Sequence, residues 1–437
     1  MNRSIFKAYD IRGVYPEELN DEIAYRIGSA AGEFFKENVV VGRDPRISSD
    51  PIFRSFSEGI TENGLDVIDI GTIDTPGLYF AVGHYGYKAG AIITASHNPK
   101  EYNGFKMCRE SAIPVGGDSG LNDIKRIYTE SVNKVKTGEK RGKIIKKDMR
   151  KDYLDHILKF YNPSKRKRVA IDCSNGAACV MLPLILEKVD IDAIAINDEM
   201  DGNFPAHEPN PLKEENLAQL KETIKKENAD FGVCFDGDAD RLGVVSGKGD
   251  TIRNDFLTAM IAKRLLKKQK NETVLYDLRS SRVVGEEIEK ARGRGVMCRV
   301  GHAFIKKQMR EANAIFAGEL SGHYYYRDNF FADNALITFM YLLSMDIDPT
   351  HLKRYWASGE VNVKTQNKDV FKRIEREFSG RGKIFYLDGI SFESDDYWFN
   401  VRPSNTEPLV RINVEAKERE TMEKYKKILI EMVTVAE

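Results

Sequence analysis

The sequence predicts an α/β protein: three similar α/β domains with mixed, mainly parallel sheets, followed by a smaller C-terminal α+β domain. The first observation is a repeated unit opening, an apolar run closed by an aspartate and followed by a helical pattern, at residues 39–44, 169–174 and 273–278. The second is a conspicuous loop after a later apolar run of each unit. The third is a change of pattern after about Tyr355.

The three loops follow the apolar runs 92–93, 232–235 and 314–317 and begin near Ser96, Asp236 and Glu319. Strands that alternate with helices form sheets whose strand ends carry ligand-binding loops. We therefore expect the three loops to occupy equivalent positions in the three units.

The C-terminal part has a different pattern. Residues 397–401 and 409–414 are predicted strands that flank a loop beginning at Arg402, and residues 418–432 are a predicted closing helix. A small tethered domain with its own anion site can close over a central cleft built by the other three. A length of 437 residues allows three or four domains, and the predicted boundaries are 1–147, 148–248, 249–356 and 357–437.

Composition narrows the classes of partner. Lys+Arg and Asp+Glu both number 67, so no global field favours nucleic acid or an anionic membrane. The first residues lack the apolar core of a signal peptide, and no run approaches a membrane span. We expect a cytoplasmic protein. The five cysteines lack CxxC spacing and fit reduced core thiols better than disulfides or zinc ligands.

The stretch 94–106 breaks the predicted strand 89–93 with small residues and an Asn-Pro turn, which presents Ser96 at a strand tip. A hydroxyl there can carry a covalent group, while the neighbouring His97 or Lys106 can exchange a proton, and Lys106 can neutralise an anion.

Three aspartates alternate with small residues in the second loop. In an extended conformation Asp236, Asp238 and Asp240 can converge on a hard cation, for which Mg²⁺ is the expected ion. An EF-hand loop starts similarly, but Arg241 replaces its glycine and Gly247 its bidentate glutamate, so that interpretation fails.

The loop after residue 401 contains phosphate-binding groups: a permanent cation, two hydroxyls and an amide on a turn. The groups are Arg402, Ser404, Asn405 and Thr406, and Arg411 on the following strand can assist them. The third loop offers an acceptor and donors suited to sugar hydroxyls in Glu319, Ser321 and His323.

Four motifs in order, at 96–106, 236–241, 318–323 and 402–408, together resemble the α-D-phosphohexomutases, the phosphomannomutase and phosphoglucomutase superfamily. Residues 6–13 resemble the opening motif of that family. The resemblance implies three alike α/β domains plus a smaller fourth. It also implies that Ser96 carries a phosphate, that Tyr9 and Arg12 face the cleft, and that Glu319 and Ser321 contact the 3- and 4-hydroxyls of the sugar. His302 and His323 become ligand or proton-transfer residues.

The implied reaction interconverts hexose 6-phosphate and hexose 1-phosphate. The phosphate on Ser96 would be bridged by Mg²⁺ on the three aspartates, with Arg241 and Lys106 stabilising transferred charge. A hexose 1,6-bisphosphate is the intermediate and activator, and it must turn around in the site. The general base is Lys106 or a histidine such as His97 or His302, and the sequence does not choose between them.

The resemblance favours mannose phosphate as substrate, with glucose phosphate a close second, because residues 319–321 read Glu-Leu-Ser. Many bacterial members carry a lysine where Arg279 stands, so the role of that position is open. The alternatives are a phosphoglucosamine mutase, a phosphosugar phosphatase and a non-catalytic phosphosugar-binding protein. The expected partner is a small phosphosugar, for a chain that acts as a monomer or a homodimer.

Overall fold

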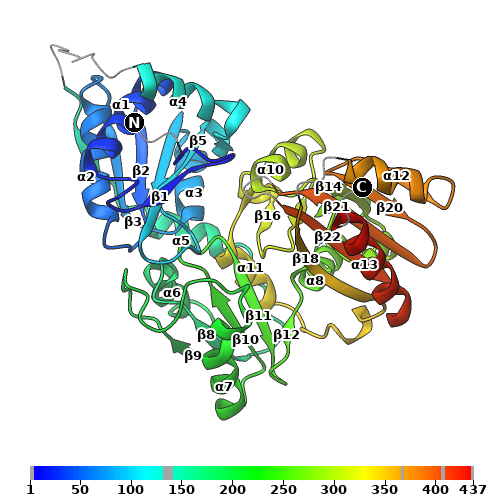
Figure 1. Cartoon of the computed structure of the whole chain (residues 1–437). Coiled ribbons are helices and arrows are strands. Elements are labelled where there is room, and N and C mark those ends of the chain that lie inside the picture. The colour runs from blue at the N-terminus through cyan, green and yellow to red at the C-terminus, as the bar shows by residue number, and fades with distance from the viewer. Residues whose placement is uncertain (1–3, 131–140, 366–368, 405–408, 435–437) are drawn as a thin grey trace. The chain divides into compact units, whose positions relative to one another are not determined.

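The computed structural model describes residues 4–130, 141–365, 369–404 and 409–434. The chain divides into two compact units (Figure 1). The first contains Met1–Ile252, Met309–Phe316 and Ser321–Ile347, and the second contains Arg253–Gln308, Ala317–Leu320 and Asp348–Glu437. Among the helices in the described part of the chain, none combines the length and the hydropathy that crossing a bilayer requires.

The first unit begins with a mixed sheet in the order β1-β5-β4-β2-β3-β7, with β6 beside β5. Pairing is parallel from β4 to β7 and antiparallel from β1 to β4. Antiparallel pairing is as extensive as parallel pairing here, because β5 returns beside β4 as a hairpin. The strands are β1 (Ile11–Val14), β2 (Val39–Arg43), β3 (Val67–Thr72), β4 (Ala89–Ile93), β5 (Tyr102–Arg109), β6 (Ile113–Pro114) and β7 (Ile144–Lys146).

Helices cover both faces of this sheet, which explains why its central strands are apolar at consecutive positions. Val39 and Val41 pack in one core with α1, α2 and α4, while Gly90 on β4 faces Leu78 and Val82 of α3. A Cβ on Gly28 of α1 would lie 2.0 Å from the carbonyl oxygen of Phe56 on α2, so these two helices approach closely. The helices are α1 (Asp21–Phe35), α2 (Ser49–Thr61), α3 (Thr75–Tyr85) and α4 (Leu121–Glu130).

The second sheet has the order β12-β11-β10-β8-β9. Pairing is parallel among β10, β8 and β9 and antiparallel among β10, β11 and β12. Leu220 and Ile224 of α7 pack against Ala170 and Val245 of the sheet. The elements are α5 (Arg150–Leu158), β8 (Arg168–Asp172), α6 (Ala178–Leu186), β9 (Asp192–Ile196), α7 (Ala218–Glu227), β10 (Phe231–Phe235), β11 (Leu242–Ser246) and β12 (Thr251–Ile252).

The predicted equivalence of the loops holds for the first two of the three predicted α/β repeats. Strand β4 lies between two neighbours: β2, a parallel strand that opens the repeat, and β5, an antiparallel strand that follows β4 in the chain. Strand β10 lies in the same way between β8 and β11. Ser96 and Asp236 therefore follow corresponding strand ends, as the spacing predicted.

The next segment of the chain contributes to both compact units. In the second unit β13 and β14 pair in parallel, and in the first unit β16 and β17 pair antiparallel. Its elements are α8 (Asn254–Lys268), β13 (Thr273–Asp277), α9 (Arg282–Lys290), β14 (Arg294–Cys298), α10 (His302–Glu311), β15 (Phe316–Gly318), β16 (Tyr324–Tyr326), β17 (Ala332–Asp333) and α11 (Ala335–Leu343).

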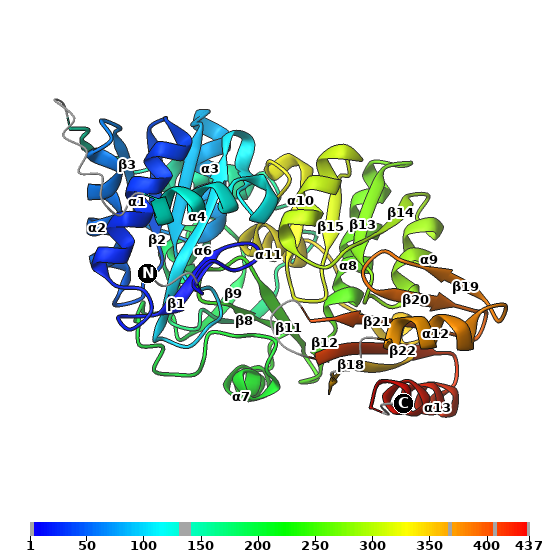
Figure 2. The same ribbon diagram turned by 45° about the horizontal axis from the view of Figure 1, so that its top comes forward.

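The C-terminal part of the second unit is an antiparallel sheet in the order β18-β22-β21-β20-β19 (Figure 2). Helices α12 and α13 pack their apolar faces on it through Ile374, Phe378 and Leu429. This confirms the small α+β domain predicted after Tyr355. Its elements are β18 (Trp356–Lys364), α12 (Val370–Phe378), β19 (Lys383–Phe385), β20 (Ile390–Glu393), β21 (Tyr397–Pro403), β22 (Leu409–Ala416) and α13 (Arg419–Thr434).

Candidate active site

Ser96 follows β4 in a left-handed backbone conformation, with φ of 54°. Such a conformation costs free energy in a residue other than glycine and persists only where surrounding groups hold it. Arg46 supplies that support. Its buried guanidinium donates hydrogen bonds to the carbonyl oxygens of Ser96 (2.8 Å), Asn98 (2.7 Å), Pro99 (2.6 Å) and Tyr102 (3.0 Å). Sequence reasoning missed Arg46.

The three aspartates of the second loop converge beside Ser96. The Ser96 hydroxyl donates to Asp236 Oδ2 at 3.0 Å, and the loop curls because Asp236 Oδ1 accepts the N–H groups of Asp240 and Arg241, both at 3.1 Å. Lys106 Nζ donates to Asp238 at 2.7 Å and to Asp240 at 2.5 Å. We call Asp236, Asp238, Asp240 and Lys106 the acidic cluster.

Gly237 explains how the two loops come so close. A Cβ at this position would lie 2.5 Å from the carbonyl oxygen of Ser96. Only glycine therefore lets the second loop approach the serine.

The acidic cluster fits a hard divalent cation. Each aspartate offers one carboxylate oxygen within 4.8 Å of the others, and all three residues are buried. Within the described residues, Asp238 Oδ1 and Asp240 Oδ1 are buried without a hydrogen-bond partner. Buried polar atoms are normally paired, and carboxylate oxygens are the ligands that Mg²⁺ prefers.

The charges within the acidic cluster shift one another's pKa values. Burial and the two neighbouring carboxylates raise the pKa of Asp236 well above its usual range. Burial also works to raise the pKa of Asp238, but the contact with Lys106 outweighs it and lowers that pKa. Burial works to lower the pKa of Lys106, and the charges of Asp238 and Asp240 raise it. Lys106 is therefore a cation at neutral pH in this arrangement.

Arg241 is held by a histidine. Its Nε–H donates to His323 Nε2 at 3.0 Å, and His323 Nδ1 lies 3.0 Å from Asp333 Oδ2. Because Nε2 accepts from an arginine, the imidazole proton belongs on Nδ1, toward Asp333. His323 is buried and engaged behind Arg241. Asp333 was not singled out by the sequence.

His97 and Arg12 lie near the Ser96 loop. His97 Nδ1 is 3.3 Å from the Ser96 hydroxyl oxygen, and burial together with Arg241, Arg12 and Lys106 lowers the pKa of His97 well below its usual value. Arg12 donates to Asn98 Oδ1 at 2.6 Å and pairs with Asp10 at 2.5 Å. Tyr9 is half-buried in the segment before β1.

The second unit contains a cluster of opposite sign. Arg402 on β21 and Arg411 on β22 are cross-strand neighbours and share one carboxylate, Glu360, at 2.6 and 3.2 Å. Within the described residues, the Nε atoms of both arginines are buried without a hydrogen-bond partner. We call these three residues the arginine cluster.

A bulge in β18 positions Glu360. The register against β22 shifts between Ala357 and Glu360, and Gly359 has φ of 68°. Such a bulge redirects the side chain that follows it. Burial works to raise the pKa of Glu360, but Arg402 and Arg279 outweigh it and lower that pKa.

The remaining predicted residues are distributed over both units. Arg279 Nη2 donates to Asp277 at 2.7 Å and lies 3.5 Å from Glu319. Asp277 and Glu319 are buried, and the Arg279 side chain is 10% exposed. Ser321 belongs to the first unit, and its hydroxyl is buried without a partner among the described residues. His302 is half-buried at the start of α10. Ser404 precedes residues 405–408, so the predicted Asn405 and Thr406 lie outside the described residues.

Comparison with known proteins identifies the family. Family models of the phosphoglucomutase/phosphomannomutase α/β/α domains I, II and III match residues 3–156, 151–249 and 253–352, and the model of the C-terminal domain matches 360–432. The chain belongs to the phosphoglucomutase/phosphomannomutase family. The resemblance seen in the four motifs is thereby confirmed, as are the α/β fold class and the small C-terminal domain. The predicted domain boundaries stay a prediction.

Relatives of this family are similar over nearly the whole chain. A phosphomannomutase of Methanocaldococcus jannaschii is 42% identical over 96% of this chain and 95% of its own length. A phosphomannomutase of Escherichia coli K12 is 36% identical, with 94% of each chain covered. The crystal structure of a Burkholderia thailandensis family member has a TM-score of 0.90 at 28% identity, covering 99% and 98%. Membership makes the chain a phosphohexomutase, a phosphate-transferring enzyme.

Three residues that hold members of the two clusters and the Ser96 loop were not predicted from the sequence. Arg46 comes shortly after the Gly42-Arg43-Asp44 strand end, and that aspartate, which pairs with Arg46 at 3.1 Å, was the available signal. Asp333 and Glu360 lie in unremarkable sequence, and only the folded strands bring them to His323 and Arg402.

Proposed function

We propose that this phosphohexomutase interconverts hexose 6-phosphate and hexose 1-phosphate, with mannose phosphate favoured and glucose phosphate also accepted. The observation that carries the proposal is the hydrogen bond from the Ser96 hydroxyl to Asp236 at the edge of the acidic cluster. A serine that carries a phosphate there has a cation site and Lys106 beside it. Similarity to proteins named phosphomannomutase favours mannose phosphate.

Ser96, Asp236, Asp238 and Asp240 would hold Mg²⁺, which when bound neutralises charge on the transferred phosphate. Lys106 and Arg241 add fixed positive charge at the same place. The phosphorus–oxygen bond to Ser96 Oγ breaks while a bond to a sugar hydroxyl oxygen forms, and the proton of that hydroxyl leaves to a base. The resulting hexose 1,6-bisphosphate turns around and returns its other phosphate to Ser96.

The geometry favours a division of labour between the two candidate bases near Ser96. Lys106 is held as a cation by Asp238 and Asp240, which suits charge neutralisation. His97 is neutral at pH 7, since its pKa is lowered, and it faces the Ser96 oxygen. The same lowered pKa makes His97 a weak proton acceptor, and the Ser96 hydroxyl donates to Asp236, so His97 and His302 both stay candidates for the base.

Arg402, Ser404, Asn405, Thr406 and Arg411 would bind the phosphate that is not being transferred. The unused Nε donors of the two arginines support this assignment, because arginine binds phosphate through paired N–H groups. Glu319, Ser321, His323, Tyr9 and Arg12 stay the predicted sugar-binding residues. The placement of His323 adds a second role for it, which is to orient Arg241.

The test is side-by-side turnover of mannose, glucose and glucosamine 1-phosphates, each with and without a trace of the matching 1,6-bisphosphate. We expect bisphosphate-primed isomerisation, fastest with mannose, abolished by a chelator and restored by Mg²⁺. Mass spectrometry is expected to find phosphate on the peptide that contains Ser96. Stoichiometric release of inorganic phosphate would instead establish a phosphatase, and fastest turnover of glucosamine phosphate would overturn the substrate assignment.

A further inference from the structure

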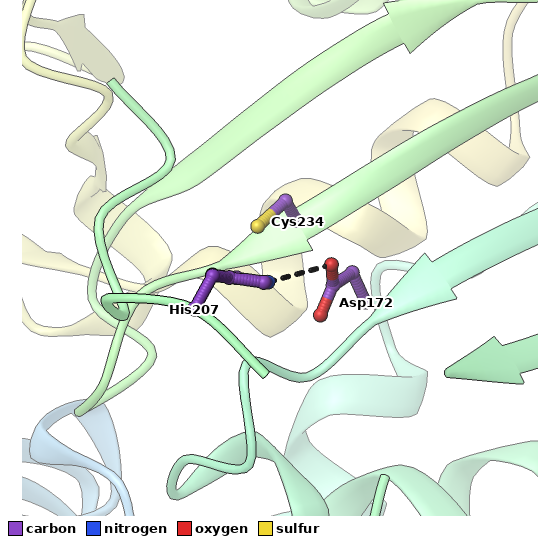
Figure 3. Close-up of side chains that lie close together, drawn as sticks. All are labelled: Asp172, His207 and Cys234. Atoms are coloured by element: carbon purple, nitrogen blue, oxygen red, sulfur yellow. Dashed lines mark hydrogen bonds and ion pairs between the residues drawn. The ribbon is translucent and has the colours of Figure 1, made fainter. Parts of the chain in front are cut away.

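A second group of potential metal ligands lies in the first unit, apart from the acidic cluster. Asp172 ends β8, and Cys234 is its register partner on the neighbouring strand β10. His207 comes from the loop between β9 and α7. Figure 3 shows the three side chains converging, and each offers a ligand atom within 4.8 Å of the others. Asp172 and Cys234 are buried, and the His207 side chain is 10% exposed.

The hydrogen bonds of His207 leave one ring nitrogen directed at a carboxylate. His207 Nδ1 lies 2.8 Å from the carbonyl oxygen of Glu208, which can only accept, so Nδ1 carries a proton. His207 Nε2 lies 3.0 Å from Asp172 Oδ2. In a neutral imidazole Nε2 is also an acceptor, so a cation must stand between these two atoms. That cation is either a second proton or a metal ion.

The surroundings resemble the outer shell of a protein metal site. Histidine ligands usually donate their other N–H to a carbonyl or carboxylate, and carboxylate ligands are themselves hydrogen-bonded. Asp172 Oδ1 accepts from the Ser174 backbone N–H at 2.8 Å and from Asn197 at 3.0 Å. The other carboxylate oxygen, Oδ2, is the one that faces His207. Among the residues that the structure describes, the Cys234 sulfur makes long contacts, at 3.5 Å to Ser174 Oγ and 3.7 Å to the Phe235 carbonyl oxygen.

We propose that Asp172, His207 and Cys234 bind a zinc ion. One oxygen, one nitrogen and one sulfur ligand suit a borderline-soft ion such as Zn²⁺, whereas Mg²⁺ prefers oxygen ligands. Three protein ligands leave the fourth tetrahedral position to water. On binding, the Cys234 thiol releases its proton to solvent and the thiolate joins the metal, together with the lone pair of Nε2.

The position of this site indicates what zinc would do. It would tie the loop that carries His207 to β8 and β10. Pro209 of the same loop packs beside Gly237, 3.3 Å from the place of a Cβ there, and Gly237 separates Asp236 from Asp238. The ion would therefore stabilise the position of the loop that supplies the acidic cluster, without contacting the phosphate itself.

The test uses the full chain, stripped of metals with a chelator and then held in excess Mg²⁺ to occupy the acidic cluster. Co²⁺ is added as a spectroscopic probe. We expect one equivalent to bind with a thiolate-to-cobalt absorption band in the near ultraviolet. Cys234→Ala should lose this band, while Cys108→Ala, which removes another buried thiol, should retain it. A cobalt form without the sulfur band overturns the proposal and leaves a protonated His207–Asp172 pair in its place.

Zinc affinity and melting give a second readout. Zn²⁺ should raise the melting temperature of the native protein and of Cys108→Ala but not of Cys234→Ala, whose zinc affinity should fall at least about 100-fold. Equal affinities for native protein and Cys234→Ala overturn the proposal. If Cys234→Ala does not fold, His207→Gln decides alone: a large loss of zinc affinity supports the site, and unchanged affinity overturns it.

Discussion

The acidic cluster of the first unit and the arginine cluster of the second use the same kinds of side chains in opposite proportions. In the acidic cluster three buried carboxylates lie together, and one lysine pairs with two of them, Asp238 and Asp240. In the arginine cluster two arginines share one carboxylate, Glu360. The acidic cluster leaves carboxylate oxygens without partners, and the arginine cluster leaves Nε–H donors without partners, as judged over the described residues.

The sign of the unpaired atoms indicates the ligand of each cluster. Unpaired carboxylate oxygens attract a cation and unpaired guanidinium donors attract an anion, because burying either without a partner costs free energy. A phosphohexomutase needs both, one to activate a phosphate for transfer and one to hold a phosphate in place. The following experiments test this division, in order of decreasing expected effect.

Ser96→Ala removes the proposed phosphate carrier from the edge of the acidic cluster. Mutase flux should fall about 10,000-fold or more, as expected when a covalent nucleophile is lost. A coupled assay of hexose 6-phosphate formation measures it. Ser57→Ala is the matched control, because it removes a buried hydroxyl that has no partner among the described residues. If flux in Ser96→Ala stays near the native level, Ser96 is not the carrier.

Asp74→Asn tests a buried carboxyl beside the acidic cluster. Asp74 caps α3 by accepting from the Gly77 N–H at 2.6 Å, and burial raises its pKa to about 7. The native state therefore holds a proton that the unfolded chain releases near pH 4. The free energy of unfolding should fall as pH rises from about 4 to about 7, by ~1.4 kcal/mol per pH unit or ~4 kcal/mol in total.

Because asparagine also caps helices, Asp74→Asn should flatten this fall while keeping α3 intact. Urea unfolding at several pH values, with a chelator present, measures the profile. The exposed Asp155→Asn is the control and should keep the native slope. A native slope in Asp74→Asn would assign the pH dependence to other groups.

Arg402→Ala tests the anion site of the arginine cluster. KM for the phosphosugar should rise about 10- to 150-fold with a smaller change in kcat, since a hydrogen bond to a charged group contributes about 1.5–3 kcal/mol. Steady-state kinetics provide both constants. Arg381→Ala, which breaks a surface pair with Glu377 and a cation–π contact with Phe378, should leave both unchanged. A fall in kcat at constant KM would contradict the binding role.

Asp333→Asn tests how Arg241 is held beside the acidic cluster. Losing the charge behind His323 should lower kcat about fivefold, equivalent to about 1 kcal/mol, with KM unchanged. Asp333→Glu, which restores the charge, should recover part of the loss, and the exposed Asp328→Asn should have no effect. A change in the melting temperature without any change in kcat would limit Asp333 to a structural role.

Much of the fold could be predicted from the sequence, because strand and loop patterns are local. Strand β4 and the loop at Ser96 lie where the apolar run and the Asn-Pro turn placed them, and β21 and β22 are the two predicted strands. Arg402, however, lies on β21 and not in a loop that begins there, because it pairs across strands with Arg411. The exact ends of strands are harder to predict than the strands themselves. The apolar run 314–317 predicted a strand, but β15 is Phe316–Gly318. The two differ because an apolar run indicates burial, whereas a strand is defined by its ladder of hydrogen bonds.

The sequence by itself determined which chemical groups are available: a serine after one strand, three aspartates two residues apart after another, and an arginine near the end of a third. Tertiary structure decided their partners. Arg46 reaches the Ser96 carbonyl across 50 residues and Lys106 reaches Asp238 across 132, while a bulge in β18 directs Glu360 to Arg402. Local spacing shows where charges cluster along the chain, but which charges neutralise one another depends on strand order and register, which form only when the sheets assemble.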